Sequence, residues 1–230
     1  MPSVLITSAN RGLGLEFARQ YLAEGWHVYG ACRMPDRAEK LQRLVETGAG
    51  QIEVLQMDVT NRSTIDRAAA AIGTAAIDVI INSAGIMGNS ATVGNVDYDS
   101  WIATLNVNTL GPLRVLESFL EHLARGTRKL VVTITSGMGS IGDNTSGGYI
   151  PYRSSKAAVN MVMRTVALDL KPRGISCVVV NPGWVRTDMG GSSAPLTPEQ
   201  SVTSLRRLIQ TFGPAHSGKF FNYDGKEYPW

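Results

Sequence analysis

Short runs rich in valine and isoleucine alternate with longer amphipathic stretches along the chain, and this alternation limits the folds it can adopt. The runs cover 3–8, 27–33, 52–58, 77–85, 129–136, 175–183 and 218–223. Stretches such as Val79-Ile80-Ile81 are apolar without interruption, which is typical of parallel strands buried on both faces. The pattern predicts about seven parallel strands.

Helical periodicity fills the segments between these runs. The predicted helices cover 13–24, 36–46, 62–72, 99–124, 152–170 and 198–211. The last has a clear start, because Thr197, Pro198 and Gln200 stand in the order of an N-cap, a first-turn proline and a capping box. The alternation predicts an α/β fold, a Rossmann-type doubly wound sheet with helices on both faces. We expect a single domain over 1–230, with a small substrate lid at about 187–212.

Composition excludes several functional classes. The chain has 230 residues and a net charge of +3, and its basic residues are scattered, so no nucleic-acid-binding arm is indicated. No apolar run approaches the roughly 20 residues of a membrane span, and we expect no signal peptide before the first predicted strand. The two cysteines and three histidines have no metal-ligand or disulfide spacing. We expect a cytoplasmic protein without a metal and without nucleic-acid or membrane partners.

The stretch "TSANRGLG" (7–14) follows the first predicted strand and opens the first predicted helix. Helix amino ends bind anions through free N–H groups, and Gly12 and Gly14 allow a phosphate to approach the backbone. An ordinary strand-to-helix turn would look similar, so this motif alone is weak.

The end of the second predicted strand bears on the choice of cofactor. A site for NAD needs a carboxylate there, to accept hydrogen bonds from the adenosine ribose. This chain has Arg33 instead, and Arg11 in the glycine turn adds a second cation on the same side. Both could pair with a 2′-phosphate, which favours NADP(H) over NAD(H). The alternative is that both arginines are solvated surface residues.

Tyr152 and Lys156 are four residues apart on a predicted helix, so they share one face. An ammonium group near a phenol lowers the phenol pKa from about 10 and makes the tyrosine an acid and base usable near neutral pH. Tyr149 is a weaker candidate, because Arg153 four residues later is not a tunable ammonium.

Several motifs occur in a recognisable order. "TSANRGLG", "NSAG" (82–85), "NVNTLG" (106–111), "VTITSGMGS" (132–140), "YRSSK" (152–156) and "NPGWVRTDM" (181–189) together resemble the short-chain dehydrogenase/reductases over essentially the full chain. The segment "NPGWVRTDMGG" and the ending "HSGKFFNYDGKEYPW" are most similar to the branch of sniffer-type carbonyl reductases and C-factor proteins.

The resemblance implies a catalytic set of Asn108, Ser136, Tyr152 and Lys156. Tyr152 would give a proton to the substrate carbonyl as hydride arrives from the nicotinamide, and Ser136 would hydrogen-bond the same oxygen. Lys156 would lower the tyrosine pKa and bond the nicotinamide ribose. Asn108 would hold a water that links Lys156 to solvent.

The resemblance also implies a set of cofactor-binding residues, for each of which an ordinary loop role is the alternative. Besides Tyr152 and Lys156, the set contains Thr7, Ser8, Asn10, Arg11, Gly12, Leu13, Gly14, Arg33, Asp58, Val59, Asn82, Ala84, Gly85, Pro182, Gly183, Val185 and Thr187.

Three positions depart from the family pattern. Ser8 stands where a glycine is usual, and Ser83 stands where a second asparagine is usual. Ser136 lies 16 residues before Tyr152, farther than the commonest spacing. Ser140 is therefore a rival for the catalytic serine, although Ser136 has the expected place at the end of a strand.

The substrate side is less defined. Ile86, Met138, Tyr149, Trp184 and Met189 stand beside the motifs, so a small apolar ketone, aldehyde or quinone is expected, unless some of these residues belong to the core. The main alternative function is a regulatory or signalling protein that binds NADP(H) with little turnover. A hydrolase is disfavoured, because G-x-S-x-G does not occur.

The predicted helices 99–124 and 152–170 are apolar over more than one face. One face must cover the sheet, so the other is expected to pack against a second copy in a dimer or tetramer.

Overall fold

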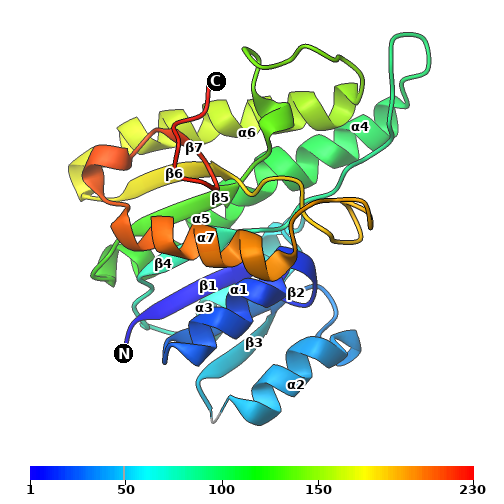
Figure 1. The fold of residues 1–230 in the computed structure, drawn as a ribbon. Coiled ribbons are helices and arrows are strands. Elements are labelled where there is room, and N and C mark those ends of the chain that lie inside the picture. The colour runs from blue at the N-terminus through cyan, green and yellow to red at the C-terminus, as the bar shows by residue number, and fades with distance from the viewer. Residues whose placement is uncertain (49) are drawn as a thin grey trace.

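The sheet contains seven parallel strands, as the sequence predicts (Figure 1). The computed structural model describes residues 1–48 and 50–230. The strands are β1 (Ser3–Thr7), β2 (His27–Cys32), β3 (Ile52–Gln56), β4 (Val79–Asn82), β5 (Leu130–Ile134), β6 (Ser176–Asn181) and β7 (Phe220–Asn222). Their order is β3-β2-β1-β4-β5-β6-β7, so β1 and β4 are neighbours at the centre.

Helices cover both faces of this sheet (Figure 1). They are α1 (Gly12–Ala23), α2 (Glu39–Thr47), α3 (Arg62–Ala71), α4 (Tyr98–Leu105), α5 (Gly111–Arg125), α6 (Ile150–Asp169) and α7 (Pro198–Thr211). One core layer joins α1, α2 and α7 to the sheet, and another joins α3, α5 and α6. The strands supply both layers, because Val4 and Ile6 face the first and Leu5 faces the second.

The helix predicted over 99–124 is interrupted. A π-helical turn at Asn106–Leu110 separates α4 from α5. Pro112, at the start of α5, has no N–H to donate to the preceding turn. The Asn108 side chain lies inside the protein and bonds neighbouring elements, which favours the bulge.

The other helix boundaries are close to those predicted. Helix α6 begins at Ile150, two residues early, with Pro151 in its first turn. A short 3-10 turn at Pro35–Arg37 precedes α2. The predicted capping box of α7 is present, with Thr197 accepting from the Gln200 N–H at 3.1 Å and Gln200 accepting from the Thr197 N–H at 2.9 Å.

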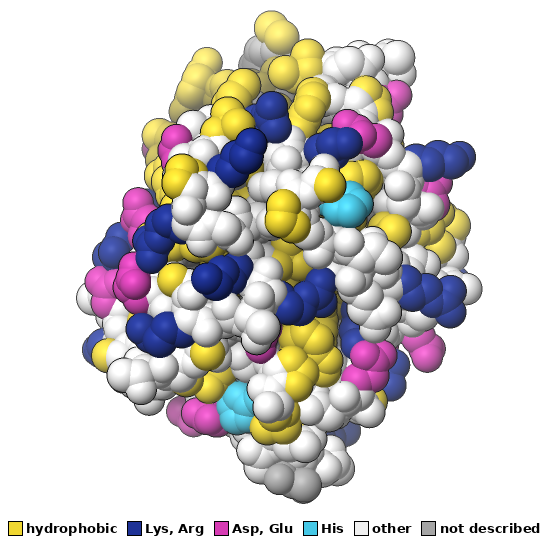
Figure 2. Space-filling view, turned by 90° about the vertical axis from the view of Figure 1, so that its left-hand side faces the viewer, with side chains coloured by type: hydrophobic (Ala, Val, Ile, Leu, Met, Phe, Trp, Pro, Cys, Tyr) yellow, Lys and Arg dark blue, Asp and Glu magenta, His cyan; other side chains and the backbone are white. Residues whose placement is uncertain are grey.

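Charges are dispersed over the face of the molecule that Figure 2 shows. Figure 2 shows the side that lies at the left in Figure 1, where Lys and Arg side chains are spread among hydrophobic and acidic ones. Among the helices that the structure describes, none is long and apolar enough to span a membrane.

Candidate active site

The loops that follow β1 and β4 diverge at the centre of the sheet, where such folds bind ligands. Their starting points are joined by Thr7, whose hydroxyl oxygen accepts from the backbone N–H groups of Ser83 and Ala84, each at 2.9 Å. The glycine turn therefore opens beside the "NSAG" segment.

Tight backbone packing explains the glycines of the turn. A β-carbon placed on Gly14 would lie 2.3 Å from the Ser8 carbonyl oxygen, closer than any side chain allows. Gly12 has a φ of 52°, in the left-handed region that favours glycine. Ser8 also has a positive φ, 56°, which explains why a glycine is usual in the family at this position.

Tyr152 and Ser136 meet at the carboxyl end of β5. Tyr152 lies in the first turns of α6 and is 6% exposed. Burial raises the pKa of its phenol above the ordinary value, and the neighbouring Ser136 side chain lowers this pKa in part. The phenol is therefore protonated at neutral pH, as a proton donor must be.

Lys156 lies one helical turn beyond Tyr152 and is 5% exposed. Its Nζ donates to the Ile134 carbonyl oxygen at 2.9 Å and lies 5.7 Å from the centre of the Tyr152 ring. The ammonium group thus faces β5 and the ring, and the predicted lowering of the tyrosine pKa by Lys156 is not found. Burial lowers the pKa of Lys156 itself to about 8.

Asn108 comes from the π-helical turn to the same place. Its amide donates to the Ile86 carbonyl oxygen at 2.8 Å and to the Ser155 hydroxyl at 2.9 Å, and its Oδ1 accepts from the Ile86 N–H. A β-carbon on Gly85 would lie 3.4 Å from Asn108 Oδ1 and 3.6 Å from Lys156 Nζ. A side chain on Gly85 would therefore enter the space that both groups border.

The rival serine has another environment. Ser140 is buried, and its hydroxyl donates to the Trp230 main-chain oxygen at 3.0 Å and accepts from the Asp143 N–H. Of the two serines, Ser136 is the one whose side chain lies close enough to the Tyr152 phenol to lower its pKa in the described structure. The geometry favours the serine at the strand end.

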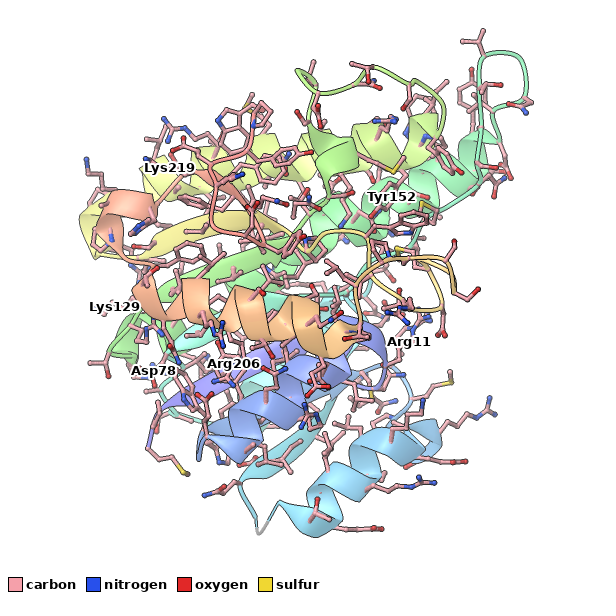
Figure 3. All side chains as sticks on the ribbon, in the orientation of Figure 1. Arg11, Asp78, Lys129, Tyr152, Arg206 and Lys219 are labelled. Carbon is pink, nitrogen blue, oxygen red and sulfur yellow. The ribbon has the colours of Figure 1, made fainter. Side chains whose placement is uncertain are left out.

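A cavity of about 120 Å³, here called the Tyr152 cavity, extends from Tyr152 and Lys156 to the glycine turn, while Ser136 and Asn108 lie behind its wall. The predicted site residues on its wall are Ser8, Arg11, Gly12, Leu13, Gly14, Gly85, Tyr152, Lys156, Pro182 and Thr187. Figure 3 shows Arg11 and Tyr152 on the same side of the molecule, away from Asp78 and Lys129. The structure thus brings together residues from four separate motifs.

A second cavity of about 160 Å³, here called the Arg33 cavity, lies on the other side of Ser8, Arg11 and Gly85. The predicted residues on its wall are Thr7, Ser8, Asn10, Arg11, Arg33, Asp58, Val59, Ala84 and Gly85. Its wall also contains Arg37, which the sequence analysis missed. The only signal was its place four residues after Arg33, in a stretch expected to be helical.

Comparisons with known proteins agree with this geometry. The family model described as short chain dehydrogenase matches residues 2–196. The chain belongs to the short-chain dehydrogenase family. The C-signal protein of Myxococcus xanthus is 46% identical over 157 residues, covering 68% of this chain and 95% of that protein.

Solved structures of carbonyl reductases resemble this short-chain dehydrogenase along its length. The carbonyl reductase Sniffer of D. melanogaster is 34% identical with a TM-score of 0.94, and all of each chain is covered. The NADPH-bound carbonyl reductase from chicken fatty liver is 32% identical with a TM-score of 0.94, covering 100% of this chain and 99% of that one. The resemblance drawn from the motifs is confirmed.

Three predicted cofactor residues of this short-chain dehydrogenase lie outside both cavity walls. Asn82 is buried, and its amide donates to the Thr133 hydroxyl of the neighbouring strand at 3.2 Å. Gly183 has a φ of 78° and packs against Leu196 and Tyr223. Val185 is buried and forms a bridge with Leu196. In this structure, all three shape the loops around the site.

The expected substrate-side residues are dispersed. Met189 lines the Tyr152 cavity, and Ile86 lines the Arg33 cavity. Trp184 is exposed, with its indole N–H donating to the Gly190 carbonyl oxygen at 2.8 Å, and Tyr149 is exposed at the N-cap of α6. Met138 is half-buried in the turn that follows Ser136.

The proposed lid segment of the short-chain dehydrogenase has two parts. Loop 187–196 contributes to the Tyr152 cavity, and its Asp188 pairs with Arg11 at 3.3 Å. Helix α7 instead packs into the core against α1. In the described parts of the chain, no three His, Cys, Asp or Glu side chains are grouped as a metal site.

Proposed function

We propose that this short-chain dehydrogenase uses NADPH to reduce a small apolar carbonyl compound, a ketone, aldehyde or quinone, to an alcohol. The observation that carries the proposal is the buried Tyr152, beside Ser136 and one turn from Lys156, on the wall of the same cavity as the glycine turn. Two solved structures that match this chain over their whole or nearly whole length are carbonyl reductases, one of them with NADPH bound.

The residues of the two cavities fit NADP(H). The bare backbone at Gly12 and Gly14 at the amino end of α1 suits a pyrophosphate. Three cations, Arg11, Arg33 and Arg37, border the Arg33 cavity and suit a 2′-phosphate. Asp58 lines the same cavity, but its Oδ1 accepts from the N–H and the hydroxyl of Thr60.

When bound, the reduced nicotinamide supplies a hydride. Ser136 then holds the substrate carbonyl oxygen by a hydrogen bond, and Tyr152 donates a proton to that oxygen. The raised pKa of Tyr152 keeps the proton on the phenol until the oxygen becomes basic. Placing both donors before the reaction lowers its barrier, because little reorganisation is then needed.

Lys156 and Asn108 support the proton transfer. A pKa of about 8 lets Lys156 exchange protons with solvent near neutral pH, so it can supply the proton that restores the Tyr152 phenol after the reaction. The space beside Gly85, bordered by Asn108 and Lys156, suits a water on the proton's route.

The first test follows NADPH absorbance with a panel of ketones, aldehydes and quinones. We expect wild type to turn over at least one class, and Tyr152→Phe to lose about 1,000-fold in kcat with little change in the Kd of NADPH, because only the proton donor is removed. Equal activity of the two proteins would remove Tyr152 from the mechanism.

The second test concerns the 2′-phosphate. We expect Arg33→Ala to weaken NADPH binding by about tenfold to a hundredfold and NADH binding by less than about twofold. The reason is that a charged hydrogen bond contributes about 1.5 to 3 kcal/mol. Fluorescence titration measures both dissociation constants, and Arg43→Ala, an exposed arginine on α2, is the control. Equal losses for the two cofactors would contradict the assignment.

A second candidate function rests on the similarity to the C-signal protein. A regulatory or signalling protein of this family would bind NADP(H) with little turnover. Tight NADPH binding together with an inert wild type and an equally inert Tyr152→Phe would favour it.

A further inference from the structure

The chain folds back along β7 after Asn222. Phe221 forms an antiparallel bridge with Glu227, and the Tyr228 N–H donates to the Phe220 carbonyl oxygen at 2.7 Å. The 228–230 segment is thereby carried over the loop that follows β5.

This segment is attached to the core. The rings of Tyr228 and Trp230 lie 5.0 and 5.6 Å from the ring of Phe220, measured between centroids. Phe220 is fully buried among Val159 and Met163 of α6. The segment therefore has a fixed position relative to the helix that carries Tyr152.

Polar groups of the segment hold the loop after Ser136. The Trp230 main-chain oxygen accepts from the Ser140 hydroxyl and from the N–H groups of Ile141 and Gly142. The Tyr228 hydroxyl donates to Asp143 Oδ2 at 2.6 Å. Because the Asp143 N–H donates to the Ser140 hydroxyl, these contacts form one connected network.

The network reaches the residue next to Ser136. A β-carbon placed on Gly137 would lie 2.8 Å from the Tyr228 hydroxyl oxygen. On the opposite side, Asn160 of α6 donates to the Gly139 carbonyl oxygen at 3.2 Å, and Gly139 packs directly against Lys156. The 136–143 segment is thus held between α6 and the 228–230 segment.

We propose that the 228–230 segment is a positioning element for Ser136, and that the Tyr228–Asp143 hydrogen bond is its central contact. This inference rests on the proposed carbonyl reduction, because Ser136 needs a defined distance from the proton donor Tyr152 only when both act on the same substrate oxygen. Small displacements of such a group slow the reaction strongly, since a shift of about 1 Å can reduce the rate about 100-fold.

The test removes the Tyr228 hydroxyl and nothing else. Tyr228→Phe is expected to lower kcat for a carbonyl substrate about tenfold and to leave the Kd of NADPH within about twofold, because Ser136 acts on the substrate oxygen. Hydride transfer should become slower, so the isotope effect with 4-deuterated NADPH should increase. Tyr98→Phe, at an exposed tyrosine of α4, is the control.

The partner residue provides a rescue. Asp143→Ala should lower kcat as much as Tyr228→Phe does. The double variant should lower kcat no further, because each single change already removes the same hydrogen bond. Asp143→Asn should keep most of the activity, since its amide oxygen accepts the same hydrogen bond. Asp99→Ala, at an exposed aspartate of α4, is the matched control.

Hydrogen exchange of the 136–143 peptide separates this inference from the proposed function. Faster exchange in Tyr228→Phe together with the loss of kcat supports the positioning role. Unchanged kcat, or a loss in Asp143→Asn as large as in Asp143→Ala, overturns it while carbonyl reduction stands. A wild type that reduces no carbonyl overturns the proposed function, and the positioning role with it, even where exchange increases.

Discussion

The backbone conformation of Ser8 and the pKa of Lys156 are two properties that the neighbouring sequence does not predict. The glycine turn is recognisable from its spacing, but the left-handed conformation of Ser8 is visible only in the structure. The Tyr152–Lys156 spacing predicts that the phenol and the ammonium group lie on one face of a helix, and in α6 they do lie together. It does not predict that burial controls both pKa values, because burial depends on the whole fold.

Ser8→Gly should stabilise the protein. A left-handed conformation costs a non-glycine residue about 1 to 2 kcal/mol, and the greater freedom of glycine in the unfolded chain offsets about half of this. We expect a gain of about 0.5 to 1 kcal/mol in the free energy of unfolding, measured by urea denaturation at constant m. Ser8→Ala keeps a β-carbon and should give no gain; a loss in Ser8→Gly would mean that the hydroxyl makes a compensating contact.

Among the elements, strands were easier to predict than helix interruptions. Uninterrupted apolar runs define buried parallel strands, and β1 to β7 all fall within the predicted ranges. The break between α4 and α5 depends on contacts of Asn108 with Ile86 and Ser155, which are distant in sequence. Arg37 was missed for a similar reason: a cation beyond a strand looks like a surface residue until the cavity beside it is known.

Asp78 links the starts of three strands at the edge opposite the site (Figure 3). It precedes β4, and its carboxylate accepts from the N–H groups of Ser3, Thr127 and Arg128 at 2.9, 2.8 and 3.3 Å. Burial acts to raise its pKa, but these hydrogen bonds outweigh burial, so the pKa lies below the ordinary value. The ionised form is therefore the one that stabilises the fold.

The pH dependence follows from the sign of this shift. Because the folded-state pKa is depressed, the stabilisation is complete above the unfolded value of about 4 and is lost as the pH falls below it. Asp78→Asn should lower the free energy of unfolding at pH 7 by about 2 kcal/mol and flatten its decline between about pH 5 and 2. Denaturation at several pH values measures both, and an unchanged slope would assign the acid sensitivity to other carboxylates.

At the scale of the molecule, α4, the π-helical turn that follows it and α6 leave apolar side chains in water. Ile102, Leu110, Met161 and Leu168 are between 45% and 67% exposed. The inner sides of α5 and α6 already cover the sheet, as the apolar periodicity predicted. The second apolar face is the basis for expecting a homo-oligomer, which stays a prediction.

Leu168→Glu together with Met161→Glu should shift such an oligomer to monomer, because two buried charges would face each other across a symmetric interface. Light scattering at about 10 μM gives the mass. At this concentration an oligomer with a Kd of about 1 μM or lower is mostly assembled. Val93→Glu, at an exposed loop residue, is the control. A monomeric wild type would contradict the expectation.

The contact between α1 and α7 has a consequence for how the protein is made. Arg206 of α7 donates to the Gln20 carbonyl oxygen, pairs with Glu24 and lies over the Tyr21 ring, all of which belong to α1 or its end. On the ribosome α1 emerges early and α7 late, so the side of α1 that contacts α7 stays exposed during most of synthesis. Nascent chains halted before residue 198 should therefore offer this side of α1 to chaperones, and release of α7 should end that exposure.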